Sequence, residues 1–174
     1  MKNARSLGLV LLLLGSTSAA GFLCWLERQY PAPLVWEPYS LVEKGLYMGG
    51  AVEKPPPGTQ AVLNLCQDKD GYQCDVHTWD PIPDRAPAPG LDWLRKQVDF
   101  VAAQRKAGRT VFVHCRAGIS RSTMVVTAYL MQKHHWTRDR ALEFVRSKRP
   151  IVQPNPAFMD LLLEWERALK EKKS

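Results

Sequence analysis

The fold of this 174-residue chain is decided by one stretch, which runs from Val111 to Ser122 as VFVHCRAGISRS. Its first three residues are apolar and favour a β-strand. A short segment containing glycine follows, and the mostly apolar run from Thr123 to Lys133 predicts a buried helix. The sequence therefore predicts a strand, a tight loop and a helix N-terminus in direct succession.

A loop of this kind suits an anion the size of phosphate. Its backbone N–H groups and the first turn of the helix point inward, and the helix dipole adds partial positive charge. In the same field a cysteine is stabilised as a thiolate, and its pKa falls from about 8.5 to roughly 3.5–7.5. We therefore predict that Cys115 is a nucleophile at neutral pH.

Three polar residues near Cys115 have predicted supporting roles. Arg121 carries a planar guanidinium that can hold two phosphate oxygens at once, which a lysine cannot copy. Ser122 can donate a hydrogen bond to the cysteine sulfur and so ease its departure as a thiolate when a phospho-cysteine breaks down. His114 is expected to order the loop by hydrogen bonding rather than to transfer protons.

The chain resembles the dual-specificity branch of the cysteine-dependent protein phosphatases, both in the string His-Cys-x-x-Gly-x-x-Arg-Ser at 114–122 and in Ala-Tyr-Leu-Met at 128–131. The resemblance covers about residues 36–168 and implies an α/β fold, with a central, mainly parallel sheet flanked by helices. It also implies two-step phosphomonoester hydrolysis through a phospho-cysteine, without a metal or organic cofactor. The substrate-binding residues that it implies are Arg116, Ala117, Gly118, Ile119, Ser120 and Arg121.

The alkoxide or phenolate that leaves during the attack needs a proton, and a positioned carboxylic acid typically contributes about 10²–10⁴-fold. Two aspartates compete for this role. Asp84 lies 31 residues before Cys115 on a proline-rich loop, and the resemblance places the acid there. Asp80, in Trp-Asp-Pro, is more simply a strand-end or turn-forming residue before proline. We therefore predict that Asp84 is the acid and then the base for the attacking water.

Two further residues gain a hypothesis from the resemblance. Cys66 ends an Asn-Leu-Cys that is similar to a segment of tensin-type lipid phosphatases, in which the cysteine forms a reversible disulfide with the nucleophile. A small buried thiol is an equal alternative for Cys66, and a disulfide with Cys74 is a third in an oxidising compartment. Asn155 is expected to hydrogen-bond the phosphate loop or, equally, to cap a helix.

Hydrophobic periodicity predicts the surrounding elements. Strands are expected at Leu46–Gly50 and Ala61–Leu65, with a polar turn between Gln67 and Cys74. Helices are expected over Leu91–Lys106, over Arg138–Ser147 after a Thr137 cap, and through an apolar stripe formed by Phe158, Leu161, Leu162, Trp165 and Leu169. A cluster of basic residues, by default a solvated helix face and end, comprises Arg138, Arg140, Arg146, Lys148 and Arg149.

The formal net charge of +7 favours acidic partners such as phosphoproteins or anionic lipid. No aromatic residues interleave with the basic clusters, so the sequence predicts no nucleic-acid site. Four cysteines and four histidines show no zinc-type spacing, and no metal is implied. The oligomeric state is left open.

Four segments follow from the composition. Residues 1–26 are predicted to be a signal anchor or a signal peptide, 27–38 a linker, 39–170 the catalytic domain and 171–174 a basic tail. Twenty uncharged residues from Leu7 to Leu26 match a bilayer span, which favours a single-pass membrane anchor. The alternative is cleavage before Gly21, which would give a secreted or periplasmic protein.

The substrate expected from the resemblance is phosphotyrosine and phosphoserine or phosphothreonine in proteins. The alternative is a membrane phospholipid, either phosphatidylglycerophosphate or a phosphoinositide, which the predicted anchor and the basic charge favour. Ile119 argues against inositol lipids, because many lipid-active loops carry lysine or arginine at that place. A non-catalytic phosphoprotein-binding module is a third hypothesis, which the presence of Cys115, Arg121 and a candidate acid disfavours.

Overall fold

The structure is a computed structural model that describes residues 37–171. The predicted anchor or signal peptide at 1–26 lies outside the described residues, as do almost all of the linker and of the basic tail. Between residues 37 and 171, no helix is both long enough and apolar enough to cross a bilayer.

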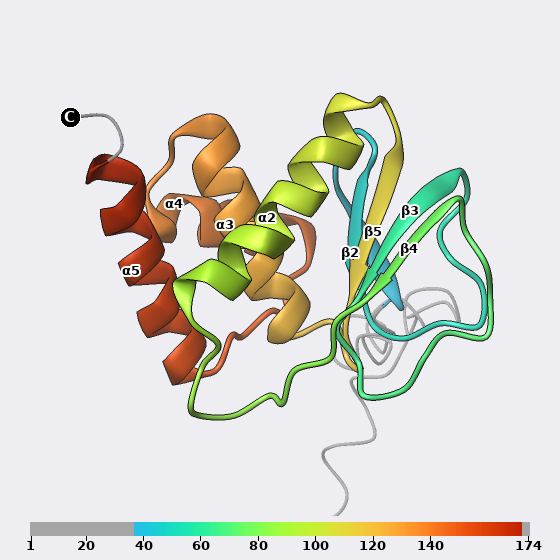
Figure 1. Ribbon diagram of the computed structural model, residues 1–174, viewed down its shortest axis with the longest axis horizontal. Helices are drawn as coiled ribbons and strands as arrows, with labels where there is room; N and C mark the ends of the chain where they lie inside the picture. The colour runs from blue at the N-terminus through green and yellow to red at the C-terminus, as the bar shows by residue number, and fades with distance from the viewer. Residues whose placement is uncertain (1–36, 172–174) are drawn as a thin grey trace, which may run out of the picture. The chain divides into compact units, whose positions relative to one another are not determined.

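A five-stranded sheet forms one layer, in the order β1-β2-β5-β3-β4 (Figure 1). Its strands are β1 Tyr39–Glu43, β2 Leu46–Gly49, β3 Thr59–Asn64, β4 Val76–Trp79 and β5 Thr110–His114. Strand β5 pairs in parallel with both β2 and β3, and β4 pairs in parallel with β3. Only β1 runs antiparallel to its neighbour, β2. The predicted mainly parallel sheet is therefore confirmed, with the strand that leads into the signature loop at its centre.

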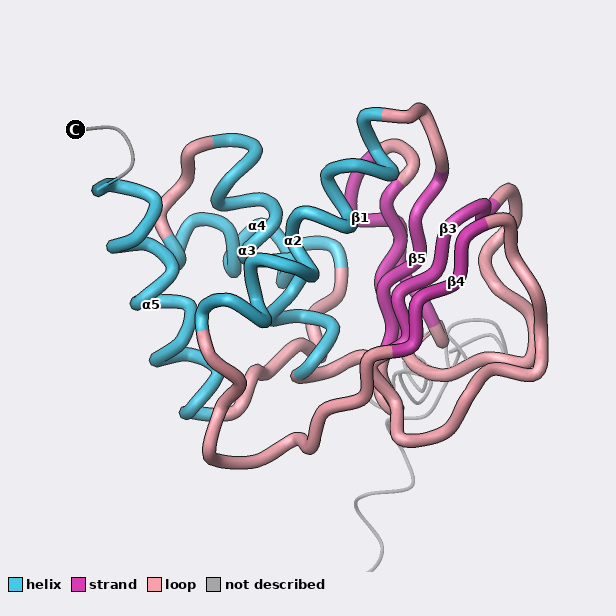
Figure 2. The backbone as a smooth tube through the Cα atoms, in the orientation of Figure 1, coloured by secondary structure: helices cyan, strands magenta, loops and turns pink. Residues whose placement is uncertain are grey.

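The helices of residues 37–171 lie together on one side of this sheet (Figures 1 and 2). They are α2 Leu91–Lys106, α3 Arg121–His134, α4 Arg138–Lys148 and α5 Pro156–Glu171. Helix α2 has the predicted bounds, and the Thr137 side chain caps α4 by accepting a hydrogen bond from the backbone N–H of Arg140. The helical predictions are confirmed: α2, α4 and α5 each bury one apolar face, and α3 is a mostly apolar, buried helix.

Strands β1 and β4 were not predicted from the sequence. Strand β4 is only four residues long and contains His77 and Thr78, so it shows no apolar alternation. It is a strand because it pairs with β3, with Ala61 beside Val76 and Asn64 beside Trp79. Edge strands of this kind depend on their neighbour more than on their own sequence.

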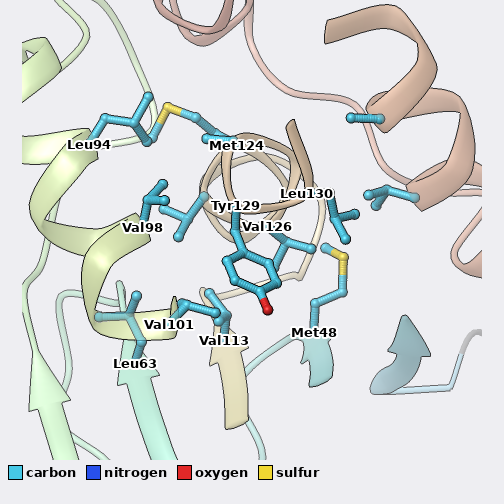
Figure 3. Packing of buried hydrophobic residues seen from close by; sticks show 14 of the residues in the cluster. Met48, Leu63, Leu94, Val98, Val101, Val113, Met124, Val126, Tyr129 and Leu130 are labelled. Carbon is cyan, nitrogen blue, oxygen red and sulfur yellow. The ribbon is translucent and has the colours of Figure 1, made fainter. Parts of the chain in front are cut away.

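Helix α3 is the centre of the core, and every residue from Arg121 to Met131 is buried. Figure 3 shows its side chains packed between helix α2 and the sheet; the labelled residues are Met48, Leu63, Leu94, Val98, Val101, Val113, Met124, Val126, Tyr129 and Leu130. Each fully buried large apolar side chain contributes about 1.5–3 kcal/mol to folding. This packing fixes the N-terminus of α3 against the end of β5, where the signature loop lies.

Candidate active site

The signature loop, residues 115–120, joins the end of β5 to the start of α3. It lies against the end of β2, where the N–H of Cys115 donates to the Gly49 carbonyl at 3.2 Å and the N–H of Ala51 donates to the Arg116 carbonyl at 3.1 Å. Gly118 has φ +67°, and a Cβ there would lie 2.3 Å from the Gly49 carbonyl carbon. Only glycine fits this position, because any side chain would collide with backbone atoms.

Cys115 is buried in the loop, with 1% of its surface exposed. Burial alone would raise the pKa of its thiol. Hydrogen bonds from the side chain and the backbone N–H of Ser122 outweigh that effect, and the Arg121 charge and the Gly118 N–H add to them, so the pKa of Cys115 lies below its ordinary value. These groups favour the thiolate, the form that acts as a nucleophile.

Ser122 lies in the first turn of α3, with its Oγ 3.4 Å from the Cys115 sulfur and 3.4 Å from the Gly49 carbonyl oxygen. A hydroxyl has one hydrogen to donate, so its donation shifts to the sulfur when the sulfur becomes negative. This is the contact expected of a group that stabilises the leaving thiolate.

We expect Ser122→Ala to lower kcat about 10- to 100-fold and to produce a burst of released alcohol before the steady state. A hydrogen bond to a charged group is worth about 1.5–3 kcal/mol, and here it is lost where the phospho-cysteine breaks down. Stopped-flow assays would detect the burst. Ser147→Ala is the matched control, since Ser147 is exposed and its hydroxyl donates to the Phe144 carbonyl. An Ser122→Ala enzyme with unchanged kcat and no burst would contradict the assigned role.

Arg121 is buried, and backbone carbonyls hold its guanidinium. Its Nη1 donates to the carbonyls of Leu65 at 3.1 Å and Ile82 at 3.3 Å, which follow β3 and β4. Its Nε is buried and makes no hydrogen bond within residues 37–171. The guanidinium is therefore held through Nη1, while Nη2, like Nε, makes no hydrogen bond within residues 37–171 and can donate to the oxygens of a bound anion.

Asp84 faces the signature loop. Its Oδ1 accepts hydrogen bonds from Ser120 Oγ at 2.6 Å and from Asn155 Nδ2 at 2.8 Å, and its Oδ2 lies 3.6 Å from Arg121 Nε. Asn155 also caps helix α5, because its Oδ1 accepts from the N–H of Phe158, while its own N–H donates to Ser120 Oγ. Both contacts proposed for Asn155 therefore exist together, and the carboxylate of Asp84 lies beside the anion cradle.

Asp80 has a different set of partners. Its carboxylate accepts from Trp93 Nε1 at 3.2 Å, Lys96 Nζ at 2.9 Å and Gln97 Nε2 at 2.8 Å, all on helix α2. Burial would raise the pKa of Asp80, but these hydrogen bonds outweigh it and hold the pKa below the ordinary value. Asp80 therefore connects the end of β4 to α2, and its carboxylate oxygens bond α2 rather than the signature loop.

His114 is fully buried beneath the nucleophile, and its ring is held by Asp70. His114 Nε2 lies 3.0 Å from Asp70 Oδ2, and His77 Nε2 lies 2.9 Å from the same oxygen. Burial lowers the pKa of His114, against the opposing effect of Asp70. In a neutral ring the proton is on Nε2, because the carboxylate can only accept. Asp70 comes from the polar turn after β3, and nothing in the sequence marked it.

Cys66, Cys74 and Cys115 are free thiols. Cys66 Sγ lies 3.7 Å from His114 Nδ1 and also lines the cleft that leads to Arg121. Burial, followed by the negative charge of Cys115, raises the pKa of Cys66 to about 11, so Cys66 is a protonated thiol at neutral pH. Its role as a redox partner of Cys115 stays a prediction.

A cleft of about 970 Å³ opens above Arg121. The charged residues that line it are Glu53, Asp68, Lys69, Asp70, Asp84, Arg85, Arg116 and Arg121. Acidic and basic groups are equal in number, so the walls carry no strong charge of either sign, although the whole chain is basic.

The default prediction for Arg149 was wrong. Arg140, Arg146 and Lys148 are exposed, as expected of a solvated face, but only 3% of the Arg149 surface is exposed. Its guanidinium donates to the carbonyls of Ala117 and Gly118 in the signature loop. The sequence signal was the proline at position 150, since the residue before a proline leaves the helix and can turn inward.

Comparison with known proteins matches the sequence of this chain to a known family. The model of the family described as "Dual specificity phosphatase, catalytic domain" matches residues 58–168. Human dual specificity protein phosphatase 1 is 43% identical over 86 residues, which are 49% of this chain and 23% of that protein. Human dual specificity protein phosphatase 16 is 40% identical over 90 residues, which are 52% of this chain and 14% of that protein. The chain thus spans less than a quarter of the length of these relatives.

Solved structures share the fold. A mouse protein described as a dual specificity phosphatase and crystallised with zinc tungstate has a TM-score of 0.73 and 26% identity, covering 92% of this chain and 96% of that one. Human DUSP28 has a TM-score of 0.71 and 29% identity over 78% of this chain and 97% of that one. PTPMT1 in complex with PI(5)P has a TM-score of 0.71 over 79% of this chain and 100% of that one, at 22% identity, and shares the fold alone.

Proposed function

Because this chain belongs to the family of dual specificity phosphatase catalytic domains, we propose that it removes phosphate from tyrosine and from serine or threonine of proteins through a phospho-cysteine. The observation that carries the proposal is the convergence of three groups on one loop. The Cys115 thiol has a lowered pKa, the Arg121 guanidinium is fixed by two carbonyls, and the Asp84 carboxylate lies 3.6 Å from Arg121 Nε.

In the first step, the amides of residues 116–121 and the Arg121 guanidinium bind the phosphate oxygens, and their positive character stabilises the charge of the transition state. The Cys115 thiolate attacks phosphorus as the bond from phosphorus to the ester oxygen breaks. Asp84 gives its proton to that oxygen, and the alcohol or phenol leaves. Cys115 is then a phospho-cysteine.

In the second step, the Asp84 carboxylate takes a proton from a water molecule that attacks phosphorus. The bond from phosphorus to sulfur breaks, and inorganic phosphate forms. The sulfur leaves as a thiolate, with the Ser122 hydroxyl 3.4 Å away to donate to it. The enzyme thereby returns to its starting state, with Asp84 protonated and Cys115 ionised.

The mixed charge of the cleft supports a protein substrate over an anionic lipid surface. Glu53, Asp68 and Asp70 line the same cleft as Lys69, Arg85 and Arg116. With acidic and basic side chains equal in number, the cleft has no net attraction for a negatively charged bilayer, whereas a peptide can offer both charges and backbone hydrogen bonds. The PI(5)P complex adds little support for a lipid substrate, because PTPMT1 is only 22% identical to this chain.

The test is phosphate release by the full chain from four substrates: a phosphotyrosine peptide, a phosphothreonine peptide, phosphatidylglycerophosphate vesicles and phosphoinositide vesicles. The proposal expects the highest kcat/KM with the peptides. Preferred turnover of either lipid would overturn the protein-substrate proposal, and binding of the peptides without any turnover would favour a non-catalytic binding module.

We further propose that residues 1–26 attach the catalytic domain to a membrane as a single-pass anchor. The support is the uncharged run from Leu7 to Leu26. The full chain should stay in the membrane fraction after carbonate extraction, and Leu11→Arg with Leu13→Arg should release it, because charge within a span is costly. If the intact mass of the mature protein instead matches a chain that begins at Gly21, the anchor proposal is overturned and the protein is exported after cleavage.

A further inference from the structure

Arg149 is a buried cation directly behind the signature loop. It is the last residue of the α4 region, in an extended conformation with φ −143° and ψ 89°, and its own N–H donates to the Val145 carbonyl. The Val152 N–H donates back to the Arg149 carbonyl at 3.2 Å, which closes a turn around Pro150. This turn sends the side chain into the protein, and only 3% of its surface stays exposed.

Four contacts hold the guanidinium of Arg149. Its Nε donates to the Gly118 carbonyl at 2.8 Å and its Nη2 to the Ala117 carbonyl at 3.3 Å. Its Nη1 donates to the Glu37 carbonyl at 2.8 Å and to Ser40 Oγ at 3.3 Å. A lysine could not reach these acceptors together, because it lacks the planar fork of donors.

The two carbonyl contacts fix the direction of two amides. In a trans peptide the C=O and the following N–H lie in one plane and point in opposite directions. With the Ala117 carbonyl turned toward Arg149, the N–H of Gly118 points to the inner side of the loop, and it contributes a hydrogen bond to the Cys115 sulfur. By the same geometry, the Gly118 carbonyl turned toward Arg149 aims the Ile119 N–H inward.

Arg149 has no carboxylate partner among the ion pairs of residues 37–171. Burial lowers the pKa of Arg149, and the Cys115 thiolate has the opposing effect. An arginine still stays charged in a protein, so this buried positive charge acts on the anions of the loop, either the thiolate or a bound phosphate.

We propose that Arg149 is a positioning residue for the hydrolysis, which turns the amides of Gly118 and Ile119 into the phosphate cradle and places a fixed positive charge behind it. The inference rests on the proposed phosphatase function and extends it to a residue outside the signature. Arg149 touches neither substrate nor the reacting atoms, and it acts through the loop. Arg149 also bonds the Glu37 carbonyl and Ser40 Oγ, so the same guanidinium holds both the signature loop and the start of the described chain.

The test compares the full chain with its Arg149→Met, Arg149→Lys and Arg146→Met variants. Arg146 is an exposed arginine on the same helix and serves as the matched control. The readouts are the pH dependence of Cys115 alkylation by iodoacetamide, followed by mass spectrometry, kcat/KM for a phosphotyrosine peptide, and the Tm.

In Arg149→Met, iodoacetamide should alkylate Cys115 about tenfold more slowly at mildly acidic pH, because less of Cys115 is thiolate. The kcat/KM of this variant should fall about 10- to 100-fold, as expected when cradle donors lose their alignment. Arg149→Lys should restore most of the alkylation rate through its charge while kcat/KM stays low, and Arg146→Met should match the original chain in all three readouts.

A purely structural role for Arg149 would lower the Tm and leave both the alkylation profile and kcat/KM of the folded fraction unchanged, which would overturn the inference. If Arg149→Met does not fold, Arg149→Lys decides, and an unchanged kcat/KM in that variant rejects the inference. Alkylation needs no substrate. If the original chain hydrolyses none of the substrates but Arg149→Met still slows the alkylation of Cys115, the phosphatase proposal is rejected. The inference that Arg149 positions the loop is then retained.

Discussion

Replacing Cys115 with serine is expected to lower kcat/KM for a phosphotyrosine peptide by at least about 10⁴-fold. The loop stabilises a thiolate through Ser122, Arg121 and the Gly118 amide. A serine hydroxyl is far less acidic than a thiol, so the same field leaves it protonated and weakly nucleophilic. Continuous phosphate-release assays at neutral pH would measure the loss.

The matched control for Cys115→Ser is Cys74→Ser. Cys74 is a free thiol in the polar turn and is only partly buried, so its loss should leave kcat/KM unchanged. The Cys115→Ser protein should still bind the phosphopeptide, because Arg121 and the loop amides remain. Turnover close to that of the original chain in Cys115→Ser would disprove the phospho-cysteine mechanism.

Asp84→Asn is expected to lower kcat for a phosphoserine peptide by about 10²–10⁴-fold, the usual contribution of a positioned acid. Asparagine keeps an oxygen for Ser120, but its amide N–H is far too weakly acidic to give a proton to the leaving alkoxide. The loss should be smaller for p-nitrophenyl phosphate, whose leaving group is a much weaker base. Steady-state kinetics with both substrates would measure this difference.

Asp80→Asn is the control for Asp84→Asn, since both remove one carboxylate from the same proline-rich region. Asp80 bonds Trp93, Lys96 and Gln97, so its replacement should lower the free energy of unfolding by about 1–3 kcal/mol and leave kcat largely intact. Thermal unfolding and kinetics together distinguish the two variants. If Asp80→Asn loses turnover and Asp84→Asn keeps it, the assignment of the acid is reversed.

The sequence by itself determined the strand, loop and helix around Cys115. Val111 to Val113 favour a strand, the run after Arg121 is apolar, and glycine at position 118 permits the positive φ of the loop. These preferences are local, and a local preference for strand or helix is kept in the folded protein when the tertiary packing favours the same structure. Helices α2, α4 and α5 followed for the same reason, because their apolar residues repeat every 3.6 residues, whereas α3 followed from an almost continuous apolar run.

Only the tertiary structure decided which polar groups surround that loop. Asp80 and Asp84 have the same side chain and lie four residues apart, yet one bonds helix α2 and the other bonds Ser120 and Asn155. Arg149 looked like a solvated helix end and is buried behind the loop.

The remaining differences have the same origin. His114 depends on Asp70, a residue 44 positions away that came from a turn without any pattern, and β4 is a strand only because β3 is beside it. A hydrophobic pattern reports which side of an element is buried, but it does not report which distant polar group lies there. Those partners are chosen when the elements pack, since each buried donor and acceptor then needs a partner that water can no longer supply.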